Sequence, residues 1–350
     1  MCVENTNSKY YDGTKLLSMK DINGNIPEIY ICTSNRTAGK STFFGRLCVN
    51  GFFKKKEKFM ILYRFVYELD DCANKFFKDI GGLFFSGHTM TSTKQARGTY
   101  HSLYIDGVHC GFAVSLNSAD TIKKYSHLFN DVKRILFDEF QSETNHYCAD
   151  EVKKLQSIHT SVARGNGEMV RYVPVYMVSN PVSILNPYYV AMNISARLTR
   201  SVKFLKGKGF VLEQGHNENA ETAQKNSGFN QAFESDEYLS YSAEGVYLND
   251  NASFVEKITG NSKYICTLRF EGRDYAIREF AEQGVIYCDD RPDKTHLNRV
   301  SVTTEDHQIN YVMLKQNNPL IIYLRYLFER GAFRFKDLRC KDVVLKTLSY

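Results

Sequence analysis

The chain has 350 residues, of which 43% are hydrophobic, and a formal net charge of +6. A chain of this length is longer than one hydrophobic core usually accommodates, so we predict a globular protein of two domains. Because the nine cysteines include no C-x-x-C pair and no apolar run is long enough to cross a bilayer, the composition favours a reducing cytoplasm and excludes a disulfide scaffold or a membrane span.

The first apolar strand, predicted over 26–33, runs into a loop typical of phosphate binding. Gly39 lets the backbone turn tightly against a ligand, and the following amides open a helix whose N-terminus favours an anion. Lys40 is placed to reach the β and γ phosphates, and the Ser41 hydroxyl to complete a Mg²⁺ shell. The pattern G-x-x-x-x-G-K-[ST] departs at its first position, which is Ser34. The loop residues predicted to bind nucleotide are Ser34, Asn35, Arg36, Thr37, Ala38, Gly39, Lys40, Ser41 and Thr42.

The next segments predict a parallel sheet with a hairpin. Residues 59–64 form a continuous apolar run that ends in a charge, as expected of a strand buried on both faces. Residues 68–79 have a helical pattern. The segments 100–105 and 108–116 flank Asp106-Gly107, a dipeptide that favours a hairpin turn.

A second site is predicted where a buried strand over 135–139 ends in two acids. Carboxylates at the carboxyl end of a strand lie where ligands bind in an open α/β sheet. Asp138 would hold Mg²⁺ through hard oxygen contacts, and Glu139 would polarise the attacking water. Taken alone, this strand is also compatible with an ordinary polar turn, and the loop at Gly39 with an ordinary helix start. Their occurrence together favours a nucleotide site.

An amphipathic helix over 149–163 ends in an exposed turn at Arg164. A strand over 170–178 then stops at Ser179-Asn180-Pro181. Asn180 is a nucleotide-binding candidate that could sense the γ-phosphate, although the same residues are equally compatible with a turn before proline. A short helix over 185–191 follows.

Composition changes after residue 212. The stretch 213–233 has few large apolar residues, which indicates a linker or mobile subdomain. Beyond it we predict strands over 263–270, 273–280 and 284–289 and helices over 319–330 and 336–348, a separate α+β domain. The predicted divisions are an ATPase domain (1–205), a linker or small linker subdomain (206–235) and a third segment (236–350). Lysine and arginine gather at 54–58, 203–208 and 325–346.

With these features placed, the sequence resembles the DNA-packaging (encapsidation) ATPases of small short-tailed bacteriophages, the phi29-like group. The likeness covers most of the chain. It is carried by 135–140, by Ser179-Asn180-Pro181-Val182-Ser183-Ile184-Leu185-Asn186-Pro187-Tyr188 and by Gly284-Val285-Ile286-Tyr287-Cys288-Asp289. The second of these is the most specific, because no general nucleotide-binding rule predicts it.

The resemblance implies an α/β P-loop NTPase fold of the additional-strand, catalytic-glutamate type, with a mostly parallel sheet, that uses ATP and Mg²⁺. It also implies a homo-oligomeric ring, a pentamer, that works transiently at the portal (connector) of a capsid in the host cytoplasm and pumps double-stranded DNA inward. A packaging RNA is a further partner of that group.

The resemblance also gives roles to two basic residues. By position, Arg164 resembles the family's arginine finger, inserted into the neighbouring subunit's site, where a guanidinium can neutralise charge on the transferred phosphoryl group. Its alternative is a helix C-terminal charge favoured by the dipole. Lys124 corresponds to a basic residue that the family links to the nucleotide.

The third segment is similar to the ribonuclease-H-like nuclease domain of large terminases. A working nuclease of that type needs several carboxylates around two metals, one of them on the first strand. The strand 263–270 has no carboxylate, so Asp289 and Asp290 lack that partner. We therefore predict a vestigial domain that contacts DNA or the portal without cutting.

Together these features predict an ATP hydrolase that translocates DNA, with Lys40, Glu139 and Arg164 as catalytic residues and Ser41 and Asp138 as metal ligands. Two alternatives stay open at this point. One is a helicase-like or partition-like ATPase, which would separate strands or form filaments. The other is a non-catalytic portal-binding protein with a degenerate nucleotide fold, for which Ser34 is the supporting feature.

Overall fold

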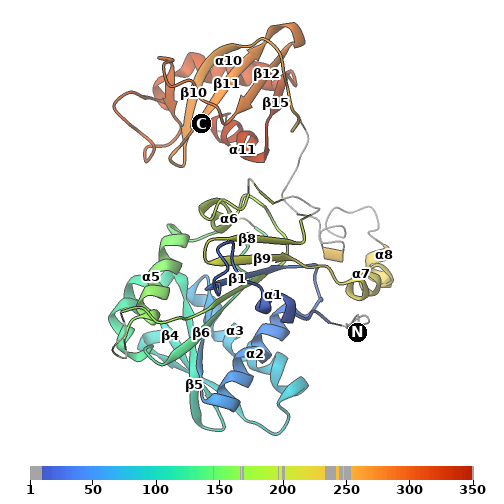
Figure 1. Cartoon of the computed structure of the whole chain (residues 1–350), viewed down its shortest axis with the longest axis vertical. Helices are drawn as coiled ribbons and strands as arrows, with labels where there is room; N and C mark the ends of the chain where they lie inside the picture. Colours follow the sequence, from blue (N-terminus) through green and yellow to red (C-terminus); the bar gives the residue numbers. More distant parts are fainter. Residues whose placement is uncertain are drawn as a thin grey trace. The chain divides into compact units, whose positions relative to one another are not determined.

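The computed structural model describes residues 10–144, 146–165, 167, 169–195, 197–198, 202–232, 242–243, 247 and 254–348. The chain divides into two compact units, residues 1–249 and 250–350 (Figure 1). Among the described residues, no helix has both the length and the apolar character that a membrane crossing requires.

The first unit alternates strands and helices, as the sequence predicts. Its main elements are α1 (Thr14–Ser18), β1 (Ile29–Thr33), α2 (Lys40–Lys55), β2 (Lys58–Tyr63), α3 (Leu69–Phe84), β3 (Met90–Gln95), β4 (Tyr100–Ile105), β5 (Val108–Ser115), α4 (Ala119–Ile122), β6 (Val132–Asp138), α5 (Glu151–Ala163), β7 (Val175–Ser179), α6 (Pro187–Ala191), β8 (Phe204–Gly207), β9 (Phe210–Gln214), α7 (Glu218–Lys225) and α8 (Gly228–Gln231).

These strands form one nine-stranded sheet in the order β3-β4-β5-β2-β6-β7-β1-β9-β8. The six strands from β5 to β9 in this order are mutually parallel, and β3, β4 and β8 pair antiparallel at the two edges. The predicted mostly parallel sheet is therefore confirmed. Since β7 lies between β1 and β6, the carboxyl ends of these three strands meet at one edge, with Thr33 opposite Ser179 and Asp138 opposite Val178.

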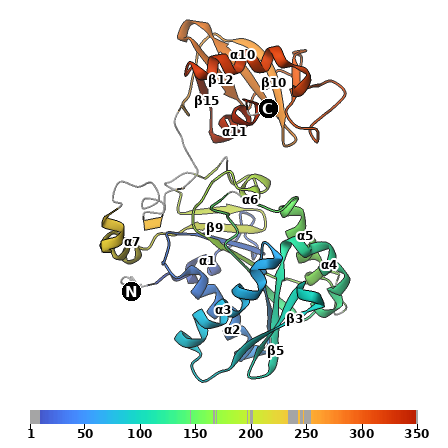
Figure 2. The ribbon, with the colours of Figure 1, turned by 180° about the vertical axis from the view of Figure 1, so that it is seen from behind.

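Apolar side chains cover both faces of this sheet, which is why its central strands are continuous hydrophobic runs. On one face, α2 and α3 bury residues such as Phe44 and Phe77 in a core shared with β1 and β2. On the other face, α5 and α6 contribute Ile158, Val162 and Tyr189 to a second core. Figure 2 shows the same ribbon from behind. The sheet and the helices on its two faces thus form a three-layer α/β arrangement. The last residues of β1, β6 and β7 do not belong to either hydrophobic core.

The segment expected to be a linker differs from the prediction. Residues 210–214 form β9, which pairs in parallel with β1 and belongs to the large sheet. The following residues include α7 and α8. Polar composition alone suggested a linker, but the contacts of this segment are with residues far away in the sequence. The strand β3, whose sequence is polar, is a further edge strand that the pattern did not predict.

The second unit contains β10 (Lys263–Phe270), β11 (Arg273–Phe280), β12 (Val285–Asp289), β13 (Arg299–Ser301), β14 (Val312–Met313), α10 (Asn318–Glu329), β15 (Phe333–Phe335) and α11 (Leu338–Leu348). Its six-stranded sheet has the order β14-β13-β10-β11-β12-β15. A separate core joins this sheet to α10 and α11. The predicted strands and helices of this α+β unit are confirmed, with boundaries shifted by at most a few residues.

Candidate functional site

The predicted phosphate loop lies between β1 and α2, at the free edge of the large sheet. Its backbone is left-handed at Thr37 (φ 61°) and Gly39 (φ 94°), whereas Ser34 has no positive φ. A positive φ favours glycine, and Ser34 does not need one. The serine at the first motif position therefore does not disturb the loop, and the departure seen in the sequence has a simple structural reason.

Lys40 lies almost fully buried across this loop, with 7% of the residue exposed. Its Nζ donates to Oδ1 of Asn180 at 2.7 Å and to the carbonyl oxygen of Ser34 at 3.2 Å. Burial lowers the pKa of Lys40, and nearby acids oppose that effect. Asn180 follows β7, so the structure brings together the lysine and the strand end that the sequence suggested separately.

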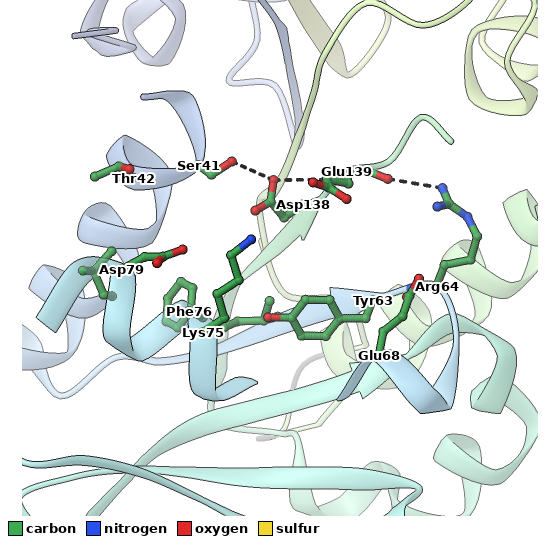
Figure 3. Close-up of a pocket in the computed structure, with 12 residues that line it drawn as sticks. Ser41, Thr42, Tyr63, Arg64, Glu68, Lys75, Phe76, Asp79, Asp138 and Glu139 are labelled. Carbon is green, nitrogen blue, oxygen red and sulfur yellow. Dashed lines mark hydrogen bonds between the residues drawn. The ribbon is translucent and has the colours of Figure 1, made fainter. Parts of the chain in front are cut away.

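The acid pair after β6 meets the start of α2. The Ser41 hydroxyl donates to Oδ1 of Asp138 at 2.8 Å (Figure 3). Burial, and then the neighbouring charge of Glu139, raises the pKa of Asp138 to about 6. Glu139 itself is exposed and has a left-handed backbone (φ 54°), with its N–H donating to Asp138 at 3.0 Å. The two predicted metal-binding residues are therefore in direct contact.

A cavity of about 920 Å³ opens over the loop, a size suited to a nucleotide. Six of the nine predicted loop residues line it together with Glu139 and Asn180; the six are Arg36, Thr37, Gly39, Lys40, Ser41 and Thr42. Its lining also contains Tyr10, Leu83 and Phe84, so the cavity combines cationic and apolar side chains.

A smaller cavity of about 250 Å³ adjoins the acid pair from the side of α3. It shares Ser41, Thr42 and Glu139 with the larger cavity and adds Lys75 and Asp79 from α3 (Figure 3). Glu139 therefore lines both cavities.

The other three predicted loop residues are buried: Ser34, Asn35 and Ala38. The Asn35 amide donates to the carbonyl oxygens of Asn217 and Ala243 at 3.0 and 2.9 Å, and its Oδ1 accepts from the Asn217 N–H at 3.0 Å. The Asn35 side chain is therefore occupied within the fold, which leaves its main chain to contact a ligand.

The segment after β9 is attached to the phosphate loop, which the sequence did not indicate. In addition to the Asn35 contacts, the Gln224 amide of α7 donates to the Arg36 carbonyl oxygen at 2.9 Å and to the Thr37 hydroxyl at 3.0 Å. Arg36 also pairs with Glu143 at 2.5 Å. The loop is therefore held from two sides by residues that are distant in sequence.

Comparison with known proteins decides the family. The family model of the podovirus DNA encapsidation protein (Gp16) matches residues 5–349. The chain belongs to this family. It is 26% identical over 340 residues to the DNA packaging protein of Bacillus phage phi29, covering 96% of each protein. It is also 25% identical over 319 residues to that of Bacillus phage B103, covering 90% of this chain and 93% of the relative.

Solved structures share the fold of this encapsidation protein. The bacteriophage phi29 viral genome packaging motor assembly matches with a TM-score of 0.71 at 24% identity over 98% of each chain. The phi28 gp11 DNA packaging motor matches with a TM-score of 0.60 at 14% identity over 97% of each chain. Together with the family match over residues 5–349, this makes the chain a DNA-packaging protein of the phi29-like type, as the sequence predicted.

In this encapsidation protein, the two remaining predicted basic residues lie together but far from the loop. Arg164, at the end of α5, donates to the Ser126 hydroxyl at 2.9 Å. Ser126 and Lys124 both belong to the short helix η4 (Lys123–Leu128), which precedes β6. Since the seven residues of β6 separate its two ends, roughly 20 Å lies between this helix and Asp138. Neither residue lines the two cavities, so a nucleotide contact within one subunit is not supported.

In the second unit of the encapsidation protein, the acids at the end of β12 are paired with bases. Asp289 forms an ion pair with Arg278 at 2.8 Å, and Asp290 pairs with Lys336. Within the part of the chain that the structure describes, no three His, Cys, Asp or Glu residues gather as a metal-binding group.

Proposed function

We propose that this chain is an ATP hydrolase whose turnover moves double-stranded DNA into a preformed capsid. One observation carries the proposal. Lys40, Ser41 and Asp138, which come from a phosphate loop and a strand end nearly a hundred residues apart, converge at one edge of the sheet. This is the constellation that binds a nucleoside triphosphate with its metal.

The sheet order supports a P-loop NTPase of the additional-strand, catalytic-glutamate type. One strand, β7, lies between the loop strand β1 and the acid strand β6. The glutamate that follows the metal-binding aspartate completes that class. A degenerate, non-catalytic nucleotide fold is less well supported, because both the lysine and the acid pair are present and in contact distance of their partners.

The donors present at the site fit ATP and Mg²⁺. Lys40 and the amides at the start of α2 would hold the phosphates. The Ser41 hydroxyl and Asp138 carboxylate, 2.8 Å apart, would hold Mg²⁺, which prefers hard oxygen ligands. When bound, the metal would offset negative charge on the phosphoryl oxygens.

Glu139 would act as the general base. It is exposed between the two cavities, so its carboxylate can reach a water molecule beside the terminal phosphate. A base contributes about 10²- to 10⁴-fold to a hydrolytic rate when it is correctly placed.

We further propose that the site is completed by a neighbouring subunit in a ring, a pentamer by resemblance. Arg164 is exposed at the opposite end of β6 from its own loop, and a residue so placed can reach a nucleotide only in another copy. Lys124, on the same surface, would act on that neighbour as well. The ring would bind the portal and DNA, with a packaging RNA as a further partner, at the portal vertex in the host cytoplasm.

The second unit would be a vestigial nuclease-like domain without nuclease activity. Three antiparallel strands, β12-β11-β10, are followed by β13 and β14, parallel to β10, an order that supports the RNase H-like resemblance. The ion pairs of Asp289 and Asp290 argue against metal binding there. Its role would be to contact DNA or the portal.

The test is ATP turnover and DNA packaging by the full chain with capsids, portal and DNA. Wild type should hydrolyse ATP and fill capsids, whereas Glu139→Gln should bind ATP without turning it over. Lys40→Ala serves as the control that loses binding. Equal turnover by wild type and Glu139→Gln would refute the proposed chemistry.

A further inference from the structure

A buried polar cluster adjoins the backbone that follows Asp138 and Glu139. It is centred on the carboxylate of Glu151, the first residue of α5. Its side chain is 1% exposed. The Arg64 Nε donates to both carboxylate oxygens at 3.1 and 3.0 Å. The Tyr188 hydroxyl donates at 2.7 Å and the Cys148 N–H at 2.9 Å. Every oxygen of Glu151 is therefore used by partners inside the protein.

Arg64 extends from this cluster to the backbone of the acid pair. Its Nη2 donates to the carbonyl oxygen of Phe140 at 2.7 Å. It also donates to the carbonyl oxygen of Glu139 at 3.3 Å (Figure 3). The guanidinium is planar and rigid, so fixing one end by Glu151 fixes the direction of the other. One side chain thus connects a buried carboxylate to the two peptide groups that follow Glu139.

The peptide at Glu139 needs such support. Its φ of 54° is in the left-handed region, which is unfavourable for a residue with a side chain. Strained backbone persists where surrounding contacts hold it in place, and it clusters at functional sites. The hydrogen bonds from Arg64 are contacts of this kind.

Glu151 favours the charged form of Arg64. Burial alone would lower the pKa of Arg64, but the hydrogen bonds and charge of Glu151 outweigh burial, and the pKa is raised. A buried ion pair is often no better for stability than apolar residues of equal volume. We therefore attribute to the Arg64–Glu151 ion pair a role in fixing geometry as well as any contribution to stability.

We propose that Arg64, held by Glu151, is a positioning residue for hydrolysis: it fixes the backbone at Glu139 and Phe140 so that the Glu139 carboxylate faces the attacking water. This inference rests on the proposed function. It predicts that weakening Arg64 affects the chemical step more than the binding of ATP, because the Arg64 side chain donates to Glu151 and to the backbone after Asp138 rather than to the phosphate loop.

The experiment compares Arg64→Lys with Arg134→Lys in the full chain. Lysine keeps the positive charge for Glu151 but cannot donate to the carboxylate and to both carbonyl groups together. Arg134 is a matched control: it is a partly buried arginine of β6, paired with Glu57 and donating to the Leu47 carbonyl oxygen, near the other end of the strand. Turnover, the dissociation constant of ATP and the melting temperature are measured for each variant.

Arg64→Lys should lower kcat about tenfold to a hundredfold, the cost of a small misplacement. ATP affinity should stay within about threefold of wild type, because phosphate binding is separate from the chemical step. Arg134→Lys should lower the melting temperature to a similar extent and keep kcat. Glu151→Gln retains one oxygen acceptor but removes the counter-charge of Arg64, and it should also lower kcat.

Two results would overturn the inference. One is an unchanged kcat in Arg64→Lys and Glu151→Gln while Glu139→Gln is inactive. The other is a loss of kcat that follows the melting temperature equally in Arg64→Lys and Arg134→Lys, which would show a structural role alone. Absence of ATP turnover in wild type would instead refute the proposed function, so the two failures are distinguishable.

Discussion

The two units each contain an apolar strand that ends in adjacent acids, and the surroundings of these acids differ completely. At the end of β6, Asp138 accepts from a serine hydroxyl, and Glu139 is exposed beside two cavities. At the end of β12, Asp289 and Asp290 are paired with Arg278 and Lys336.

This difference teaches that acids at a strand end form a site only if their charge has not been neutralised within the fold. A carboxylate in an ion pair has its charge balanced by a cation that a metal would have to displace, whereas Asp138 accepts from neutral donors, the Ser41 hydroxyl and the Glu139 N–H. The β6 acids have Lys40 and Lys75 nearby, but among the described residues neither acid forms an ion pair with them. The proposed ring would add a cation from the neighbour. The β12 pair already has its cations.

The largest effect should come from removing the Arg164 guanidinium, which we propose enters the site from the neighbouring subunit. Arg164→Ala should lower ATP turnover in assembled motors about 10³-fold, since arginine fingers have effects of that order. Mixing Arg164→Ala with Lys40→Ala subunits should restore part of the turnover, because some interfaces then combine an intact arginine with an intact loop. Steady-state phosphate release measures both. A mixture no better than either variant alone would contradict donation between subunits.

A smaller effect should separate the two acid pairs directly. Asp138→Asn should lower Mg²⁺-dependent turnover about 10²-fold, because a neutral amide is a weaker ligand for a hard cation. Asp290→Asn, the matched change at β12, should leave turnover unchanged. The measurement is turnover over a Mg²⁺ titration. Equal losses in both variants would mean that the two strand ends are not different in kind.

Unlike ATP turnover, the free energy of unfolding should depend on the ion-paired acids at the end of β12. Asp289→Ala removes the partner of Arg278, and since the two side chains are only 11% and 24% exposed, the second unit should lose about 1–3 kcal/mol of unfolding free energy. Asp290→Ala breaks a more exposed pair and should cost less than about 1 kcal/mol. Urea unfolding of the full chain, followed by a probe in the second unit, measures this. Equal stability of the two variants would contradict a structural role for Asp289.

The smallest effect is expected at the motif's missing glycine. Ser34→Gly should leave the ATP dissociation constant within about twofold of wild type and cost under about 1 kcal/mol, because the backbone there needs no left-handed conformation. Isothermal titration measures the affinity. A severe loss of binding would show that the Ser34 hydroxyl has a role beyond its weak contact with the Asn35 carbonyl oxygen.

Much of the fold could be predicted from local patterns. The strands before the loop and before Asp138, the hairpin at Asp106 and the first three strands of the second unit are each indicated by apolar periodicity and turn residues within a few positions. The edge strand β3 and the sheet strand β9 could not be predicted in this way, because their pairing partners, rather than their own composition, define them.

The sequence by itself determined the residue types of the site: the loop from Ser34 to Thr42, the acid pair and the strands that carry them, because these features are contiguous and obey short-range rules. Only the tertiary structure decided which acids are left unpaired, that Ser34 is tolerated, and that Arg64 reaches the backbone of Glu139. It also decided that Asn35 holds Ala243, 208 residues away. These contacts join positions far apart in the chain, and no local pattern encodes which distant partner a polar side chain meets.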